Sequence, residues 1–316
     1  MALSNLTTRV LVALVGIPAI VAATLLGGYV FFALVLIIAL LSLREFYALA
    51  RAKGTSPQTV AGYVAGALML SVFLYDRLHM VILSVLAGWG LAVPFPTMAQ
   101  EFLILLLVFI PLVLIGELFR GKEQPLHNVA VTIMGVMYVG FSFGTLVGLR
   151  ELFVPADFPV YAHFPVIGAA VPEEIASTIY RWGGWTVLAF FVAVWVCDSA
   201  AYFSGRAFGR HKLFVRVSPN KTWEGAIAGF AGAIAAFLIM KAIALPYLTV
   251  LQSLICGALV GSFGQLGDLV ESLLKRDAGV KDSSSIIPGH GGMLDRFDSI
   301  MMASPVLFLY LDFIVF

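Results

Sequence analysis

The chain has 316 residues, of which 61% are hydrophobic and 12% charged, and its mean hydropathy is +1.00. A soluble domain carries about 25% charged residues, so this composition excludes an ordinary soluble enzyme or binding module. The net charge of +1 points to no particular partner, and a nucleic acid is not expected as one.

The first apolar stretch is too long to be a single membrane span. No Asp, Glu, Lys, Arg or His occurs between Val10 and Leu43. At about 1.5 Å rise per residue the stretch is roughly 50 Å long as a helix, against ~30 Å for the hydrocarbon core. Gly27 and Gly28 are the natural turning point, so the sequence predicts a helical hairpin. Because the first apolar run continues directly into a second, it fits a retained hairpin better than a removable leader.

Apolar segments with few charges recur along the rest of the chain, and helices satisfy their own backbone hydrogen bonds in lipid. The ten segments are 10–26, 29–43, 59–75, 80–93, 102–118, 129–149, 182–204, 225–245, 248–267 and 299–316. Loops rich in Lys and Arg tend to stay in the cytoplasm. The four most basic loops are 51–58, 119–127, 205–223 and 274–297. Placing all four on one side requires an even number of crossings between neighbouring loops.

This parity identifies 80–93 as the segment that does not span the membrane. Three segments separate the first two basic loops, and 80–93 is short, contains two glycines and ends in Pro94-Phe95-Pro96. If it is re-entrant or interfacial, nine spans remain, the basic loops and the N-terminus lie inside, and the polar excursion 154–181 lies outside. Ten spans are the alternative. The predicted fold is an all-α polytopic helical bundle with about nine transmembrane helices.

No repeat or low-complexity linker divides the chain, so we expect one membrane domain over residues 1–316. Its N-terminal spans occupy 1–127. The C-terminal spans and a catalytic region on the cytoplasmic face occupy 128–316, because polar residues concentrate there. Cys197 and Cys256 lie in apolar runs and are interpreted as packing residues.

Charged residues and glycines crowd positions 268–298, at one membrane face. Four side chains are spaced i, i+3, i+4 and i+7 and share one helix face: Asp268, Glu271, Ser272 and Lys275. Asp295 and Asp298 follow Gly291-Gly292, which we interpret as a flexible hinge. Carboxylates from two elements, with little His and no Cys, suit a hard cation such as Mg²⁺, and the nearby Lys and Arg suit a polyphosphate. The alternative is a set of interfacial charges that snorkel to water.

The stretch 218–225, with the sequence S-P-N-K-T-W-E-G, precedes another apolar segment. Asn220 or Thr222 could cap the start of a helix, and free backbone N–H groups beside Lys221 could bind an anion. A plain helix cap in a basic loop is the alternative.

Two single carboxylates stand apart from these stretches. Asp198 is predicted to lie about two turns inside a helix, where an unpaired charge is costly, so it needs a cation or a hydrogen-bond partner. Pairing with a neighbouring Lys or Arg purely for packing is the alternative. Glu45 follows Arg44 and is interpreted as one half of an interfacial ion pair.

The run 272–298 resembles the signature of the phosphatidate cytidylyltransferase family, S-x-x-K-R-x4-K-D followed by P-x-H-G-G-x-x-D-R-x-D, with every fixed position present. Residues 198–209 and 218–225 are similar to two further blocks of that family in the same order. The resemblance covers about the C-terminal 120 residues. It implies an enzyme that transfers the cytidylyl group of CTP to phosphatidate, giving CDP-diacylglycerol and pyrophosphate.

The same resemblance implies a role for each matching residue. The catalytic residues would be Asp268, Asp295, Lys275, Arg276 and His290. CTP would be bound by Ser218, Asn220, Lys221, Lys281 and Arg296. A Mg²⁺ ion, with a second cation left open, would be held by Asp268, Asp295, Asp198 and Glu271. The enzyme would be a homodimer in a bacterial inner membrane, with its active site facing the cytoplasm.

Two other classes of protein remain as alternatives. A transporter would carry charges near the membrane midplane, whereas the strongest cluster here lies at one face. A CTP-using lipid kinase shares the substrates but transfers the γ-phosphoryl group. For the lipid substrate, we expect the acyl chains to enter between helices near 80–93.

Overall fold

The computed structural model describes residues 5–91, 94–155, 158–164, 171–289 and 291–316. The first half of the chain forms α1 (Asn5–Leu26), α2 (Gly28–Ala52), α3 (Thr59–Val72), α4 (Tyr75–Gly88), α5 (Met98–Arg120), α6 (Pro125–Gly135), the π-helical turn η1 (Val136–Gly140) and α7 (Phe141–Glu151). The second half forms α8 (Val160–His163), α9 (Glu173–Phe208), β1 (Lys212–Phe214), β2 (Ser218–Thr222), α10 (Trp223–Ala244), α11 (Val250–Asp277), α12 (Leu294–Tyr310) and the π-helical turn η2 (Leu311–Val315).

The helices confirm a polytopic membrane protein. Within the described residues, seven helices are long and apolar enough to cross a bilayer, and eight if the bent pair α3–α4 counts as one span. The apolar part of α1, Val10–Leu26, falls just below that length. Every one of the nine predicted spans therefore has a helix at its position, although the count by length and composition is seven or eight rather than nine. The alternative of ten is not supported, because α4 makes no independent span.

The hairpin predicted at Gly27 and Gly28 is present between α1 and α2. Gly27 has φ +66°, and a Cβ there would lie 2.2 Å from Tyr180 Oη, so no other residue fits this turn. Beneath the turn lies the fully buried Arg150. Its Nε donates to the Thr24 carbonyl at 3.0 Å, and its guanidinium lies 3.8 Å from the Tyr180 ring centroid. This buried cation joins α1, α7 and α9 at the end of the bundle far from the basic loops.

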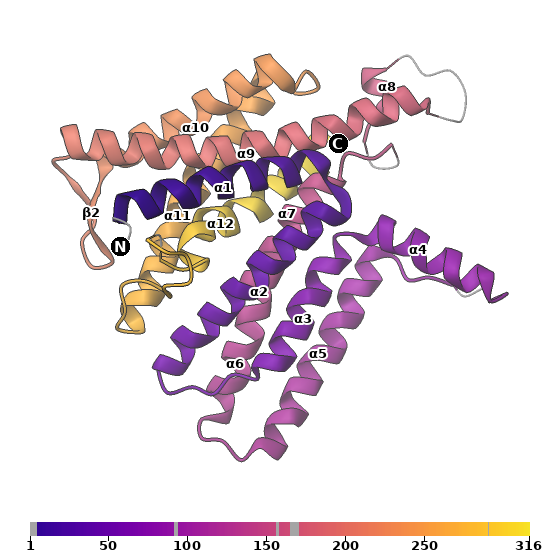
Figure 1. Ribbon diagram of the computed structural model, residues 1–316, viewed down its shortest axis with the longest axis horizontal. Helices are drawn as coiled ribbons and strands as arrows, with labels where there is room; N and C mark the ends of the chain where they lie inside the picture. Colours follow the sequence, from indigo (N-terminus) through magenta and orange to yellow (C-terminus); the bar gives the residue numbers. More distant parts are fainter. Residues whose placement is uncertain (1–4, 92–93, 156–157, 165–170, 290) are drawn as a thin grey trace.

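The α4 segment turns sharply away from the bundle. The axes of α3 and α4 differ by 93°, and α4 projects at the right of Figure 1. Arg77 of α4 donates through Nε to Glu151 Oε2 of α7 at 2.5 Å, which holds the base of α4 against the bundle. The prediction that 80–93 is not a separate span is thus confirmed.

Close helix packing in the C-terminal half sets up the charged face. A Cβ on Gly257 would lie 2.5 Å from Ile234 Cα of α10, and one on Gly267 would lie 2.5 Å from the Asp298 carbonyl oxygen of α12. Small residues allow such close backbone approach in membrane helices. As a result, Asp268 of α11 and Asp298 of α12 emerge next to one another.

Figure 1 shows the four basic loops toward the left and lower side of the molecule, with the Gly27-Gly28 turn, α4 and α8 toward the right. The basic loop 205–223 contains an antiparallel β-hairpin, β1 with β2, that the sequence did not predict. Directly after it, Thr222 caps α10 by accepting a hydrogen bond from Gly225 N at 3.2 Å. The predicted helix cap is therefore confirmed.

Candidate active site

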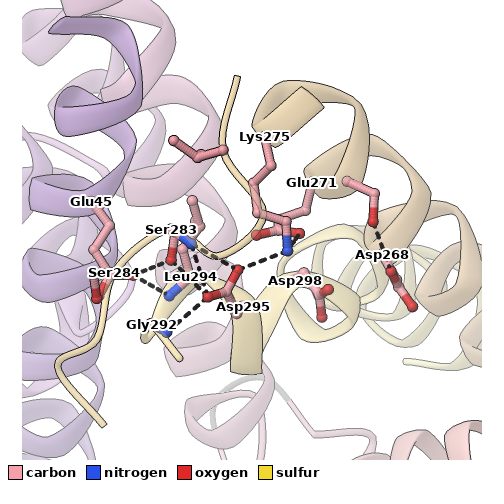
Figure 2. Close-up of polar contacts among 12 residues, drawn as sticks. Glu45, Asp268, Glu271, Lys275, Ser283, Ser284, Gly292, Leu294, Asp295 and Asp298 are labelled. Atoms are coloured by element: carbon pink, nitrogen blue, oxygen red, sulfur yellow. Dashed lines mark hydrogen bonds and ion pairs between the residues drawn. The ribbon is translucent and has the colours of Figure 1, made fainter. Parts of the chain in front are cut away.

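The end of α11 presents one continuous polar face, as its spacing predicted. Ser272 Oγ donates to Asp268 Oδ1 at 3.3 Å, and Lys275 Nζ lies 2.6 Å from Glu271 Oε2 one turn further on. Figure 2 shows Glu271 and Lys275 directed toward Asp295 at the start of α12.

Lys275 joins α11 to α12. Its Nζ donates to Asp295 Oδ1 at 2.8 Å and also lies beside Glu271. The same ammonium forms an ion pair with Glu271, whose Oε2 lies 2.6 Å from Nζ. The three side chains are 12%, 7% and 0% exposed for Lys275, Asp295 and Glu271. One buried cation thus lies between two buried carboxyl groups.

Asp295 organises the loop 278–293 from the first turn of α12. Its carboxylate accepts hydrogen bonds from Ser283 N and Ser283 Oγ, both at 3.0 Å, and from Gly292 N at 2.7 Å. A Cβ on Gly292 would lie 1.9 Å from Ser283 Oγ, so this position admits only glycine. The Gly291 carbonyl also accepts from Ile287 N at 2.9 Å, so contacts at both glycines favour a fixed turn over the predicted flexible hinge.

Glu45 of α2 holds the same loop from the other side, a role that was not predicted from the sequence. It is 2% exposed and accepts a hydrogen bond from Ser284 Oγ at 2.5 Å. The single hydroxyl hydrogen of Ser283 is shared between Glu45, at 2.9 Å, and Asp295, at 3.0 Å. The backbone N–H groups of Met293 and Leu294 also donate to Glu45, at 3.0 and 2.7 Å (Figure 2). The interfacial pair with Arg44 is wrong: Glu45 is a buried anchor that attaches the N-terminal spans to the signature loop. Its only sequence signal was that it forms, with Arg44, the charged pair that ends a long apolar run.

We expect Glu45→Ala to loosen the loop 278–293 and to lower the rate of the enzymatic reaction even when both substrates are saturating. Three donors would lose their acceptor, Ser284 Oγ and the N–H groups of Met293 and Leu294, and each buried unsatisfied group costs about 1–3 kcal/mol. Hydrogen exchange of the loop amides, measured beside activity, reports both effects. The matched control is Glu123→Ala, an exposed carboxylate in another basic loop. Unchanged exchange in the loop of Glu45→Ala would refute the anchoring role.

A second group of charges lies beside the first and comes from four elements. Lys221 Nζ of β2 lies 2.6 Å from Asp268 Oδ2. Asp198 of α9 and Asp298 of α12 lie close enough to Asp268 for the carboxylates to repel one another. Arg296 lies close enough to Asp198 to attract it. Asp198 is predicted to need a cation, and here Lys221 and Arg296 are the cations near it.

The structure divides the four predicted metal ligands between these two groups. Asp295 and Glu271 belong to the network of Lys275, whereas Asp268 and Asp198 belong to the group of Lys221. Across the residues that the structure describes, no three Asp, Glu, His or Cys side chains form a ready-made metal cage. The donor chemistry of the second group still fits Mg²⁺, which usually takes one or two carboxylates and completes its shell with water and substrate phosphates. Asp268 suits this role, because its side chain is 37% exposed and water or a phosphate can reach it.

The other predicted residues surround this charged face. Ser218 and Asn220 lie on β2 with Lys221. Arg276 is exposed and donates to the Val280 carbonyl at 3.1 Å, and Lys281 is exposed. His290 lies outside the described residues. Cys197 and Cys256 are buried free thiols, which agrees with their interpretation as packing residues.

Comparison with known proteins gives a consistent picture. A sequence model of the cytidylyltransferase family matches residues 7–314. A phosphatidate cytidylyltransferase of Synechocystis is 32% identical, over 96% of this chain and 96% of its own. A phosphatidate cytidylyltransferase of Haemophilus influenzae is 32% identical, over 98% of this chain and 99% of its own. One of Staphylococcus epidermidis is 39% identical, over 55% of this chain and 66% of its own.

Proposed function

The chain belongs to the cytidylyltransferase family, and from this premise we propose its reaction and the roles of its residues. It transfers the cytidylyl group of CTP to phosphatidate, and the products are CDP-diacylglycerol and pyrophosphate. The observation that carries this function is the meeting of carboxylates and cations from α9, β2, α11 and α12 at one end of a membrane-embedded bundle. A soluble nucleotide and a lipid phosphate can both reach such a place.

The reaction brings two anions together. An oxygen of the phosphatidate phosphate attacks the α-phosphorus of CTP, and the bond from that phosphorus to the pyrophosphate oxygen breaks. A phosphate monoester is largely dianionic at neutral pH, so it needs no strong general base. The residues therefore have to neutralise repulsion and align the reactants. Lys221 pairs with Asp268, Arg296 interacts with Asp198, and we assign both cations to the phosphates.

We assign Asp268, assisted by Asp198 and Asp298, to holding a Mg²⁺ ion. When bound, such an ion supplies charge neutralisation for the triphosphate. Asp295, Glu271 and Lys275 take a different part: their mutual contacts fix the loop 278–293 against α11. The ligand roles predicted for Asp295 and Glu271 stay predictions, and the contacts favour this positioning role instead.

The gathering of the four basic loops on one side supports an active site that faces the cytoplasm. Bacterial relatives support an inner-membrane location. We also propose a homodimer, which rests on the family resemblance alone.

The function is tested with the purified full-length chain in detergent, CTP labelled at the α-phosphorus, and phosphatidate. We expect label in the lipid fraction only when phosphatidate and Mg²⁺ are both present, loss of that label with excess EDTA, and recovery when Mg²⁺ is restored. Label that resists EDTA would contradict the metal assignment. No labelled lipid under any condition, from folded protein, would contradict the reaction.

A further inference from the structure

An apolar cavity of about 380 Å³ lies between α1, α2, α9 and α12. Its walls include Gly16 of α1, Ile38 of α2, Trp195 of α9 and Phe297 of α12. Arg296 is the one charged residue among the described residues that line it. We call this cavity the α1 groove. Its composition suits a hydrocarbon chain that ends in an anion.

The α1 groove reaches the candidate active site. Ile287 and Met293, which also line it, belong to the loop region that Asp295 and Glu45 hold in place. Arg296 follows Asp295 directly in α12. The positive charge of Arg296 attracts the carboxylate of Asp198. The polar end of the groove and the proposed site for the phosphates therefore share a residue.

The outer side of α1 has the surface of a lipid-facing helix. Leu14 and Val15 are 67% and 70% exposed, and neither lines the groove. In Figure 1, α1 runs beside α9 from the turn at Gly27 toward the side of the β-hairpin. The helix thus separates the groove from the surrounding bilayer, with one face directed toward each.

From these contacts we propose that the α1 groove binds an acyl chain of phosphatidate during the reaction, with the lipid phosphate held near Arg296. This inference rests on the proposed function. It replaces the expectation that acyl chains enter near 80–93, because α4 lies at the opposite end of the bundle from the signature loop (Figure 1). The groove lets the phosphate meet CTP while its hydrocarbon stays in an apolar environment.

The groove acts by positioning the lipid rather than by extracting it. Lipid tails are as apolar as leucine side chains, so moving a chain from bilayer to groove gains little hydrophobic free energy. Its effect is to fix the distance between the lipid phosphate and the bound nucleotide, and small misplacements at a reacting centre are costly. Bulk added inside the groove should therefore harm long-chain phosphatidate and spare a short-chain analogue that does not fill it.

Gly16→Phe adds that bulk without disturbing the helix packing. A Cβ on Gly16 would meet no heavy atom within 4 Å, so the space beside it is open. We expect kcat/KM for dioleoyl phosphatidate to fall by about tenfold relative to that for dihexanoyl phosphatidate, with KM for CTP unchanged. The matched control is Val15→Phe, the same ring on the outer side of α1, which should keep the wild-type ratio. Ala13→Leu, also in the groove wall, serves as a second variant if Gly16→Phe does not fold.

The outcomes separate the groove from the reaction itself. Equal effects on the long and short substrates, no effect on either, or the same change in Val15→Phe would overturn the groove. A changed oligomeric state in Gly16→Phe with no preference between the substrates would mark the cavity as a contact between copies, which also overturns it. Failure of the wild-type chain to label either lipid would instead overturn the proposed function.

Discussion

Asp268→Asn is expected to lower kcat by at least about 10²–10³-fold, the range seen when one charge-stabilising group is removed from an active site. Asn keeps the size of the side chain but removes the charge that faces Lys221 at 2.6 Å. It also removes a partly exposed carboxylate to which we assign Mg²⁺. Because Asp268 is partly exposed, the substitution should leave folding and membrane insertion intact. The measurement is initial rate at saturating CTP and phosphatidate over a Mg²⁺ titration.

The control for this variant is Asp277→Asn on the same helix. Asp277 pairs with Lys53 at 3.2 Å, with both side chains largely exposed, and such surface pairs contribute about 0–1 kcal/mol. Its activity should stay near that of wild type. Near-wild-type turnover in Asp268→Asn, or equal losses in the two variants, would remove Asp268 from the active site.

Lys275→Met should cause the largest loss of stability. The substitution leaves the carboxylates of Glu271 and Asp295 buried without their cation, and breaking a buried ion pair in this way costs about 3–5 kcal/mol. For a chain of this size we expect the thermal midpoint in detergent to fall by about 10 °C. Turnover should fall as well, because the loop 278–293 loses its attachment to α11.

A second substitution distinguishes charge from packing. Lys275→Met combined with Glu271→Gln removes one of the two acidic groups that lose their cation and should recover part of the thermal midpoint. If the double variant is no more stable than Lys275→Met alone, the uncompensated charge is not the cause of the loss. In that case our account of Lys275 as a shared counter-ion fails.

Local signals in the sequence were sufficient for much of the fold. The charge-free run and its glycine pair predicted the α1–α2 hairpin, and the parity of basic loops identified α4 as the segment that does not span independently. The i, i+4 spacing placed Glu271 and Lys275 in contact. Each of these features depends on residues close in the chain, or on a bilayer thickness that is known in advance.

The parts that the sequence did not predict depend on distant partners or on weak patterns. The groups that donate hydrogen bonds to Glu45 belong to residues 238 to 249 positions later in the chain. From the sequence alone, the neighbouring Arg44 was the evident partner. The strand β1 has three residues, and β2 contains a proline, so neither shows the alternation that identifies strands.

The role of Asp295 could not be deduced from its residue type. A carboxylate oxygen that binds a cation and one that accepts backbone N–H groups look alike in a sequence. Only the positions of Ser283 and Gly292 show that the donors around Asp295 are those of a loop.

Cytidylyl transfer itself is tested most directly by following two labels through one turnover. The full-length chain receives phosphatidate, Mg²⁺ and CTP labelled separately at the α- and γ-phosphorus. Our account predicts that the α-label enters the lipid and the γ-label leaves as pyrophosphate, in equal amounts. The appearance of the γ-label in the lipid, with CDP released, would contradict it and identify a lipid kinase.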